Sequence, residues 1–413
     1  MEAFVEAKRE VYAQEAKMKI CILSSFEDSM QKDTGASVRI FNLAKGLTAA
    51  GNEVRVIIPR LHATYESVEG IALNGLKGLS PRAMLEVLKK ITNVTRTTSL
   101  YFYDFLFILR VIRLVRESDI VQIEQQSSGG VLIPFIKKIL KKLVIVDCHD
   151  VFQALRVKHT SMLRRMLETS IEKLVYRYAD LLLTVSETEK KYLISTGVQE
   201  HEIEVIPNGV DTTLFAKPLE QDKTREQNGL EHFQTVVFVG NLKYLPNREA
   251  VQILASTIAP RVLKEFDDVT FLVVGEKKGE VELPGLVYTG FVNNVSDILG
   301  VSDVAVAPLF HGSGTRLKIL EYFSCGLPVV STSIGAEGLD VKDGLNICIE
   351  DDTENFALRI IELLRNKDRS ASIGKAARAL VETTYDWKQI TQKLDTVLHR
   401  LHTSKSQSTP LFS

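Results

Sequence analysis

Residues 19–59 decide the fold class, and their sequence is KICILSSFEDSMQKDTGASVRIFNLAKGLTAAGNEVRVIIP. Two short β-branched runs, 19–25 and 52–59, have the composition of strands that are buried on both faces. Between them, residues 36–51 carry apolar side chains at helical spacing, and Gly51 provides a stop signal. A strand, a helix and a second strand in this order predict a βαβ unit of a parallel sheet.

The same alternation continues along the chain and then restarts. Further strand-like runs in the first half span 119–125, 143–150, 179–186 and 203–207. After the turn-rich stretch 206–229, a second series spans 235–240, 269–275, 286–291, 303–309, 327–333 and 346–350. The sequence therefore predicts an α/β protein of two doubly wound Rossmann-like domains that face each other across a cleft, with domains over 18–208 and 209–385. A C-terminal helix over 386–404 is expected to cross back to the first domain.

Composition excludes several classes of protein. The 413 residues are 45% hydrophobic and 25% charged, with a formal net charge of -1, so we expect a globular protein with no nucleic acid partner. The four cysteines are isolated from one another, which argues against a disulfide framework and a zinc site. No uncharged apolar run reaches about 18 residues, and the first residues lack the apolar core of a signal peptide. We therefore expect a cytoplasmic protein.

Two loops that follow predicted strands could hold phosphate. In the first half, Gly35 lies in a Thr-Gly-Ala sequence at a helix start, where free N–H groups favour an anion; a plain glycine turn is the alternative. In the second half, VGNLKYLPNREA (239–250) ends a strand at Gly240 and places Asn241 and Lys243 in the loop. Lys243 could neutralise a phosphate, or it could be a solvated loop lysine. Neither loop matches a dinucleotide or P-loop fingerprint.

The strongest constellation is APLFHGSGTRLKILEYFSCGLPVVSTSIGAEGL (307–339). After a strand that ends at Pro308, small residues lead into a helix expected to begin near residue 315. Backbone amides there would point into the loop, and two cations lie close by. The candidate donor-binding residues of this segment are Gly312, Ser313, Gly314, Thr315 and Arg316, with Lys318 as a candidate for a catalytic role.

Glu321 lies farther along the same helix and has two interpretations. It could accept hydrogen bonds from the vicinal hydroxyls of a sugar, for which an ionised carboxylate is suited. It could instead form an ordinary surface pair with Lys318, three residues earlier. The cations, glycines and acid together fit a nucleoside diphosphate better than a bare phosphate.

In the first half, His149 ends the strand-like run VIVDCHD beside Asp150. A histidine at a strand terminus can donate a hydrogen bond or transfer a proton near neutral pH, although local backbone could equally satisfy it. Asp147 alternates to the other face and is expected to be structural.

Four segments resemble the retaining glycosyltransferases of family GT4, whose fold is GT-B: 186–215, 239–251, 314–339 and TYDW at 384–387. The resemblance implies that the C-terminal domain binds a nucleotide-sugar donor and the N-terminal domain binds the acceptor. It also implies retention of anomeric configuration, with no obligatory metal and no other cofactor.

The resemblance also implies roles for individual residues. Lys243 and Lys318 would face the donor diphosphate, with Arg316 a weaker candidate, and Glu321 matches the acid associated with the ribose. His149 falls where the family places a histidine near the transferred sugar, and Gly35 falls in its N-terminal diphosphate loop. Two positions depart from the pattern: Ser313 stands where the first acid of an E-x7-E motif is usual, and Asn241 where an arginine is usual.

A basic and aromatic stretch, 80–142, lies within a region (77–177) that carries 18 Lys and Arg against 9 Asp and Glu. Such helices can lie on the anionic inner face of the cell membrane, which would suit a lipid-linked or surface-polysaccharide acceptor. A core-packed helix with a solvated basic face is the alternative.

We expect a retaining transferase that moves a hexose-type sugar from a nucleotide sugar to a glycan, a lipid-linked acceptor or a small molecule. The alternatives are a sugar-nucleotide epimerase and a non-catalytic binding protein of the same fold. The departure at Ser313 motivates the second alternative.

Overall fold

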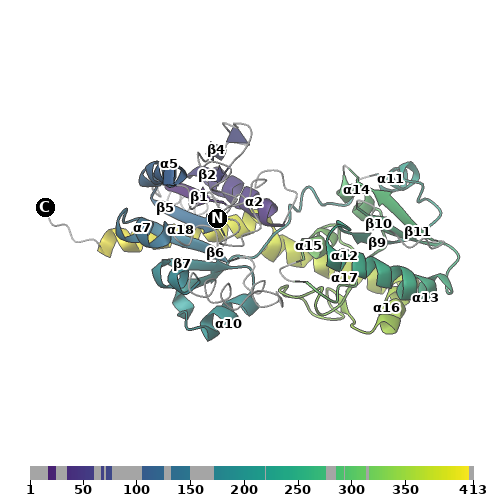
Figure 1. Cartoon of the computed structure of the whole chain (residues 1–413). Helices are drawn as coiled ribbons and strands as arrows, with labels where there is room; N and C mark the ends of the chain where they lie inside the picture. The colour runs from purple at the N-terminus through teal and green to yellow at the C-terminus, as the bar shows by residue number, and fades with distance from the viewer. Residues whose placement is uncertain are drawn as a thin grey trace, which may run out of the picture. The chain divides into compact units, whose positions relative to one another are not determined.

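The computed structural model describes residues 17–24, 35–59, 67–68, 71–76, 105–124, 132–148, 172–218, 220–275, 285–292, 294–312 and 316–408. The chain forms two compact units, one of residues Met1–Ile206 with Ile390–Ser413 and the other of Pro207–Gln389 (Figure 1). Each unit contains one sheet of its own. Each is therefore described by itself.

The sheet of the first unit is parallel except at one edge. Its order is β3-β4-β2-β1-β5-β6-β7-β8, and only the pairing of β3 with β4 is antiparallel. The strands are β1 (Lys19–Leu23), β2 (Glu53–Pro59), β3 (Ser67–Val68), β4 (Ile71–Leu76), β5 (Ile120–Glu124), β6 (Leu143–Cys148), β7 (Leu181–Thr184) and β8 (Ile203–Val205). The helices of this unit are α2 (Gly35–Ala49), α5 (Phe105–Arg116), α7 (Ile133–Lys138) and α10 (Glu187–Ser195).

The sheet of the second unit is parallel throughout, in the order β11-β10-β9-β12-β13-β14. Its strands are β9 (Gln234–Val239), β10 (Val269–Val274), β11 (Leu286–Gly290), β12 (Val304–Ala307), β13 (Val329–Ser331) and β14 (Cys348–Ile349). The helices are α11 (Gln221–Gln227), α12 (Leu245–Ile253), α13 (Ala259–Leu263), α14 (Val295–Gly300), α15 (Leu317–Ser324), α16 (Thr353–Arg365) and α17 (Lys367–Leu380).

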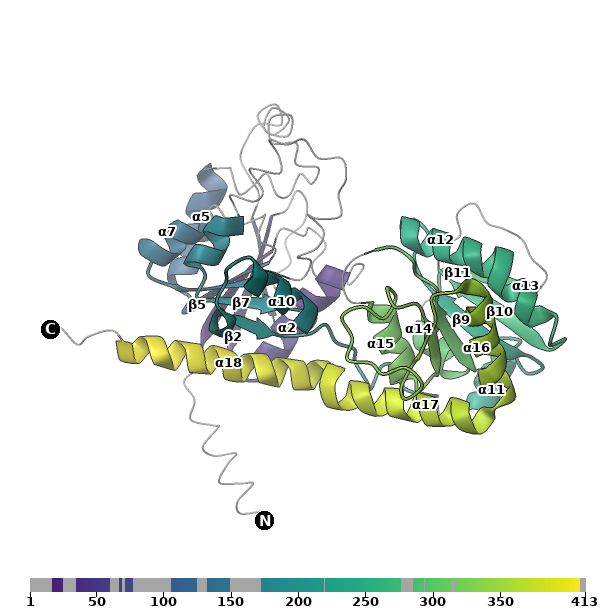
Figure 2. The same cartoon turned by 90° about the horizontal axis from the view of Figure 1, so that it is seen from below.

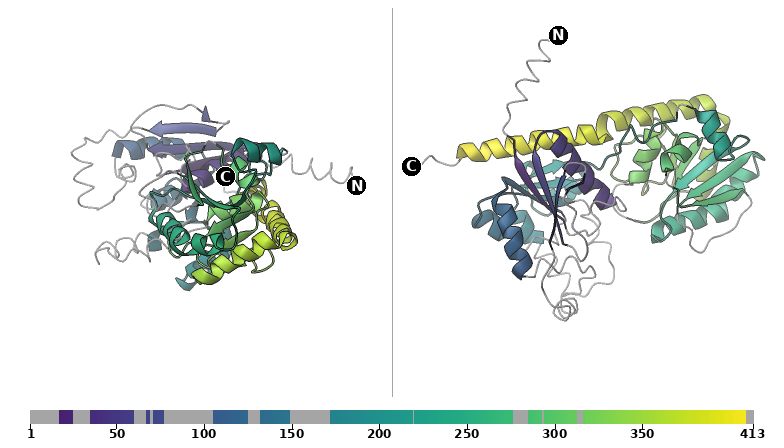
Figure 3. Two further views of the ribbon diagram at one scale, coloured as in Figure 1. Left: turned by 90° about the vertical axis from the view of Figure 1, so that its right-hand side faces the viewer. Right: turned by 90° about the horizontal axis from the view of Figure 1, so that it is seen from above.

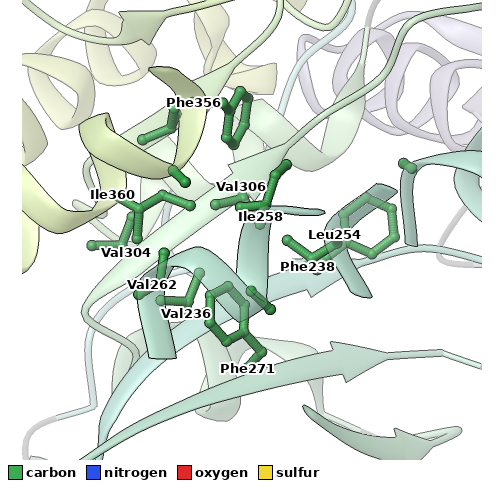
Figure 4. Packing of buried hydrophobic residues seen from close by; sticks show 14 of the residues in the cluster. Val236, Phe238, Leu254, Ile258, Val262, Phe271, Val304, Val306, Phe356 and Ile360 are labelled. Carbon is green, nitrogen blue, oxygen red and sulfur yellow. The ribbon is translucent and has the colours of Figure 1, made fainter. Parts of the chain in front are cut away.

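Alternate residues of β9 face two different hydrophobic layers. Val236 and Phe238 pack with the apolar faces of α12, α13 and α16, as the close view of this cluster shows (Figure 4). Val237 packs into a second cluster with the apolar residues of α15. Because successive side chains of a strand point to opposite faces, α12 and α15 cover opposite faces of the sheet. The second unit is therefore a doubly wound α/β layer structure.

The last helix, α18 (Trp387–Ser408), joins the first unit from Ile390 onward. It runs beside α2 (Figure 2 and Figure 3), and a Cβ added at Gly46 of α2 would lie 2.3 Å from Thr391. Asn52 donates to Asp395, and Lys393 donates to the carbonyl of Val205 at 2.8 Å. The predicted return of the C-terminal helix to the first domain is therefore present.

The predicted fold class is confirmed: each of the twelve strand-like runs contains a strand. The pair β3 and β4 was not predicted from the sequence. It lies at the sheet edge, and the six-residue run of β4 contains Asn74 and Gly75, which dilute the strand pattern. The helix expected to begin near Thr315 is present as α15, which begins two residues later at Leu317, and Arg316 has the extended conformation of an N-cap residue.

Candidate functional site

The order of the second sheet creates a switch point between β9 and β12. These two strands are neighbours, yet the helices that follow them, α12 and α15, lie on opposite faces. At such a point the loops after the two strands separate and leave a crevice beyond their carboxyl ends, where doubly wound proteins bind ligands. The segments that the sequence selected, 239–250 and 307–339, follow these two strands.

Lys318 extends from α15 toward α12 at this switch point. Its Nζ donates to Oδ1 of Asn247 at 2.8 Å and lies 4.1 Å from the centre of the Phe238 ring. Desolvation, followed by the nearby charge of Arg316, lowers the pKa of the ammonium to about 7, and the charge of Glu321 opposes both effects. Lys318 is therefore a desolvated cation at the switch point.

Asn247 connects this lysine to the loop after β9. Its side chain is buried, and its Nδ2 donates to the carbonyl of Asn241 at 3.0 Å. The side chain of Asn241 in turn accepts from the backbone N–H of Lys243 at 2.9 Å. The sequence analysis did not select Asn247; the signal available was its place directly after Pro246, in the first turn of the helix that follows the loop.

Glycines make room for this arrangement. A Cβ at Gly240 would lie 2.9 Å from the amide of Asn247 and 3.0 Å from Nζ of Lys318. At Gly275, where φ is +148°, a Cβ would lie 2.1 Å from the carbonyl oxygen of Gly240. The loop after β9 is thus closely packed between the end of β10 and the lysine.

Arg316 and Gly312 form the approach to α15. Arg316 is buried. Gly312 has a φ of +123°, which L side chains rarely adopt, and a Cβ added there would lie 2.7 Å from Nη2 of Arg316. Because α15 begins at Leu317, the first-turn N–H groups are those of Leu317 and the residues after it, later than the sequence analysis expected.

Glu321 lies one turn beyond Lys318 and is partly exposed. Burial raises the pKa of its carboxyl to about 7, and the charge of Lys318 opposes that rise. Within the residues that the structure describes, no ion pair joins Glu321 to Lys318, whose ammonium lies against Asn247 instead. The alternative of an ordinary Lys318–Glu321 surface pair is therefore wrong.

The other predicted residues are distributed differently. Lys243 and Asn241 are exposed at the same sheet edge as Lys318. Gly35 is the first residue of α2, in the first unit. His149, Ser313, Gly314 and Thr315 lie outside the described residues. The structure thus brings together Gly240, Asn241, Lys318 and their neighbours on α15.

A second polar cluster lies in the first unit, at the carboxyl ends of β5 and β6. Arg39 of α2 donates from Nε and Nη2 to the two carboxylate oxygens of Asp147, at 2.7 and 3.0 Å, and both side chains are fully buried. Glu124 is buried beside them, and desolvation followed by the charge of Asp147 holds its pKa well above the usual range. This pair fits the structural role that the sequence analysis expected for Asp147.

Two searches of the described residues bear on ligands and membranes. They contain no group of three or more His, Cys, Asp or Glu side chains placed to hold a metal ion. Among the helices formed by the described residues, none has the length and apolar character needed to cross a bilayer.

Comparisons with known proteins match most of the chain. The model of glycosyltransferase family 4 matches residues 34–214, and that of the group 1 glycosyl transferases matches residues 233–366. An uncharacterized glycosyltransferase of Methanocaldococcus jannaschii is 25% identical over 302 residues, which cover 68% of this chain and 75% of the relative. A GDP-mannose-dependent phosphatidylinositol monomannoside mannosyltransferase of Corynebacterium glutamicum is 26% identical over 239 residues, 53% of this chain and 62% of the relative.

Solved structures show the same fold over nearly the whole chain. Anabaena HepE in complex with UDP has a TM-score of 0.73 and 18% identity, with 93% of this chain and 100% of HepE covered. Sucrose-phosphate synthase of Thermosynechococcus elongatus has a TM-score of 0.71 and 17% identity, with 94% and 100% covered.

Proposed function

The chain belongs to the family 4 glycosyltransferases, and on this premise we propose that it transfers a hexose-type sugar from a nucleotide-sugar donor with retention of anomeric configuration. HepE, which has the same fold, has been solved in complex with UDP-glucose, and the Corynebacterium relative is named as GDP-mannose-dependent; both support a nucleotide-sugar donor for this chain. The acceptor we propose is a glycan, a lipid-linked saccharide or a small molecule.

The observation that carries this proposal is the desolvated ammonium of Lys318 at the switch point. A departing nucleoside diphosphate accumulates negative charge as its bond to the sugar breaks. A fixed cation in a site of low dielectric stabilises that charge without reorganising, and the first-turn N–H groups of α15 add to the same field. Glu321, one turn along α15, is the acceptor that we assign to the hydroxyls of the donor ribose.

A thermal-shift screen of nucleoside diphosphates and nucleotide sugars tests the proposal directly. A ligand that binds the folded state alone raises the melting temperature, and the stabilisation grows with the logarithm of its concentration over Kd. We expect the nucleotides of one base to raise the melting temperature most. Both the nucleoside diphosphate and the nucleotide sugar of that base should do so without added metal. A screen in which no nucleotide shifts the transition would reject the proposal.

We further propose that the first unit binds peripherally to an anionic membrane surface at the inner face of the cell membrane. Ile139, directly after α7, is 65% exposed and stands beside Lys138, with Lys141 and Lys142 following. On α5, Val111 and Val115 pack into the core, while Leu109 and two arginines, Arg113 and Arg116, are exposed. Exposed apolar side chains among cations suit the boundary between headgroups and acyl chains.

Liposome flotation tests the membrane proposal. Wild-type protein is expected to float with vesicles that contain phosphatidylglycerol and not with phosphatidylcholine alone, and Ile139→Asp should abolish flotation because it places a charge at the inserted position. Ile194→Asp, at an exposed isoleucine on α10, is the matched control. Equal flotation with both vesicles would reject the electrostatic contribution.

A further inference from the structure

Asn247 makes two hydrogen bonds that require an acceptor and a donor on the same side chain. Its Oδ1 accepts from Nζ of Lys318 at 2.8 Å, and its Nδ2 donates to the carbonyl of Asn241 at 3.0 Å. An ammonium can only donate and a carbonyl can only accept, so the side chain between them must offer one acceptor and one donor. An amide offers both. A carboxylate would leave the Asn241 carbonyl without its donor.

The position of Lys318 is further restricted by what surrounds its ammonium. The Phe238 ring lies 4.1 Å below Nζ, and Gly240 leaves no space for even a methyl group beside it. An aromatic face attracts a cation without neutralising it. The two groups that fix Nζ from β9 and α12, Phe238 and Asn247, are therefore both uncharged.

Phe238 and Asn247 together hold the Lys318 ammonium in place without neutralising its positive charge. An acid at position 247 would hold the lysine at the same place but would form a buried ion pair with it. We propose that Asn247 is a positioning residue of the donor site: it fixes the Lys318 ammonium at the switch point and leaves its positive charge available for the diphosphate of the donor. The inference rests on the proposed function and assigns a residue that the sequence comparison with the family did not select.

The test compares Asn247→Asp with Asn247→Ala by isothermal titration calorimetry. The ligands are the nucleoside diphosphate that stabilises the wild-type protein and the corresponding uncharged nucleoside. Asn247→Asp is nearly isosteric and keeps the acceptor for Nζ, yet we expect it to weaken diphosphate binding about 10- to 100-fold, because the new carboxylate neutralises the lysine and repels the ligand. Asn247→Ala should weaken it less, about 3- to 10-fold, because it loosens Nζ without adding a negative charge. Nucleoside affinity should stay within about twofold in both variants.

Lys318→Ala provides the control for a merely structural effect. In that background Asn247→Asp should weaken diphosphate binding further by less than about threefold, because the charge that it neutralises is already absent. Melting temperatures without ligand report folding, and Asn247→Ala carries the test if Asn247→Asp does not fold.

The outcomes are distinguishable. Failure of the wild-type protein to bind any nucleoside diphosphate would reject the proposed function itself. Wild-type binding with an unchanged affinity in Asn247→Asp would overturn the inference, and so would a parallel loss of nucleoside and diphosphate affinity. A larger loss of diphosphate affinity in Asn247→Ala than in Asn247→Asp would also overturn the inference, because it would show that the hydrogen bond to Nζ matters and the absence of a charge at position 247 does not.

Discussion

Lys318 and Lys243 lie at the same edge of the second sheet but in different surroundings. Lys318 is partly buried and hydrogen-bonded to Asn247, whereas Lys243 is exposed on the loop after β9. Solvent screens an exposed charge, so the two lysines should contribute unequally. We expect Lys318→Ala to lower kcat/KM by about 10- to 1000-fold, or about 1.4 to 4 kcal/mol, and Lys243→Ala to lower it less. Steady-state kinetics with the identified donor would measure both, and equal effects would contradict this ranking.

The lowered pKa of Lys318 predicts a pH dependence of donor binding. With a pKa of about 7 in the free protein, Lys318 loses its proton as the pH rises from 7 to 9. The diphosphate binds the protonated form of Lys318, so the complex holds more protons than the free protein. The affinity for the diphosphate therefore falls as the pH rises, by at most about tenfold per pH unit. Arg316, the N-cap residue of α15, and Glu321 of α15 are the charged groups beside Lys318, while Phe238 and Asn247 face it uncharged.

Lys318→Arg supplies the control for this pH dependence. A guanidinium stays charged up to pH 9, so this variant should lose the part of the pH dependence that comes from Lys318 and keep only the part that comes from Glu321, whose pKa is also about 7. Calorimetric titrations above pH 7 avoid the ionisation of the diphosphate itself. A wild-type affinity that is constant or rising between pH 7 and 9 would exclude Lys318 as the titrating cation.

At the scale of the elements, Gly240 and Gly275 have different roles in the contact between β9 and β10. A methyl group at Gly240 would meet movable side chains, Asn247 and Lys318, whereas at Gly275 it would meet the carbonyl of Gly240 in a backbone conformation that disfavours L side chains. We expect Gly240→Ala to weaken nucleotide binding at least about tenfold with less than about 1 kcal/mol of lost stability. Gly275→Ala should cost more than about 2 kcal/mol. Urea unfolding measures the stabilities, and the reverse order would contradict the packing described here.

The buried pair Arg39–Asp147 joins α2 to β6 in the first unit. Arg39→Leu would leave the carboxyl groups of Asp147 and Glu124 buried together without their cation, at a cost of about 3 to 5 kcal/mol. Arg39→Leu combined with Asp147→Leu should recover much of that loss, since the remaining Glu124 can stay protonated with its raised pKa. Urea unfolding of the single and double variants measures the difference. A double variant that is no more stable than Arg39→Leu would contradict an uncompensated charge as the cause.

Sequence patterns were sufficient for the elements that are buried on both faces. The strands β5, β6 and β10 are rich in valine and isoleucine, and every residue in them is buried. The start of α15 lies two residues beyond Thr315 because Arg316, which carries no helix-start signal, takes the extended conformation. The Lys318–Asn247 contact joins residues 71 positions apart from opposite faces of a sheet, and no local pattern encodes it. Its recognition needed the strand order as well as the motifs.

At the scale of the whole molecule, the two units carry different features. The first unit exposes basic and apolar side chains on α5 and directly after α7, and the second unit holds Lys318 at its switch point. The helix α18 ties the end of the chain to the first unit. The family matches cover both units, which agrees with a transferase that needs a donor site and an acceptor site. The sequence alone predicted this division, because the strand–helix alternation restarts after residue 229.

The most direct measurement is a crystal structure of the protein with the nucleoside diphosphate selected by the thermal-shift screen. We predict that the diphosphate lies beyond the carboxyl ends of β9 and β12, with Nζ of Lys318 within hydrogen-bond distance of a phosphate oxygen and still in contact with Asn247. A diphosphate bound at any other edge of the second unit, or one that leaves Lys318 bound to protein atoms alone, would contradict the assignment of this crevice as the donor site.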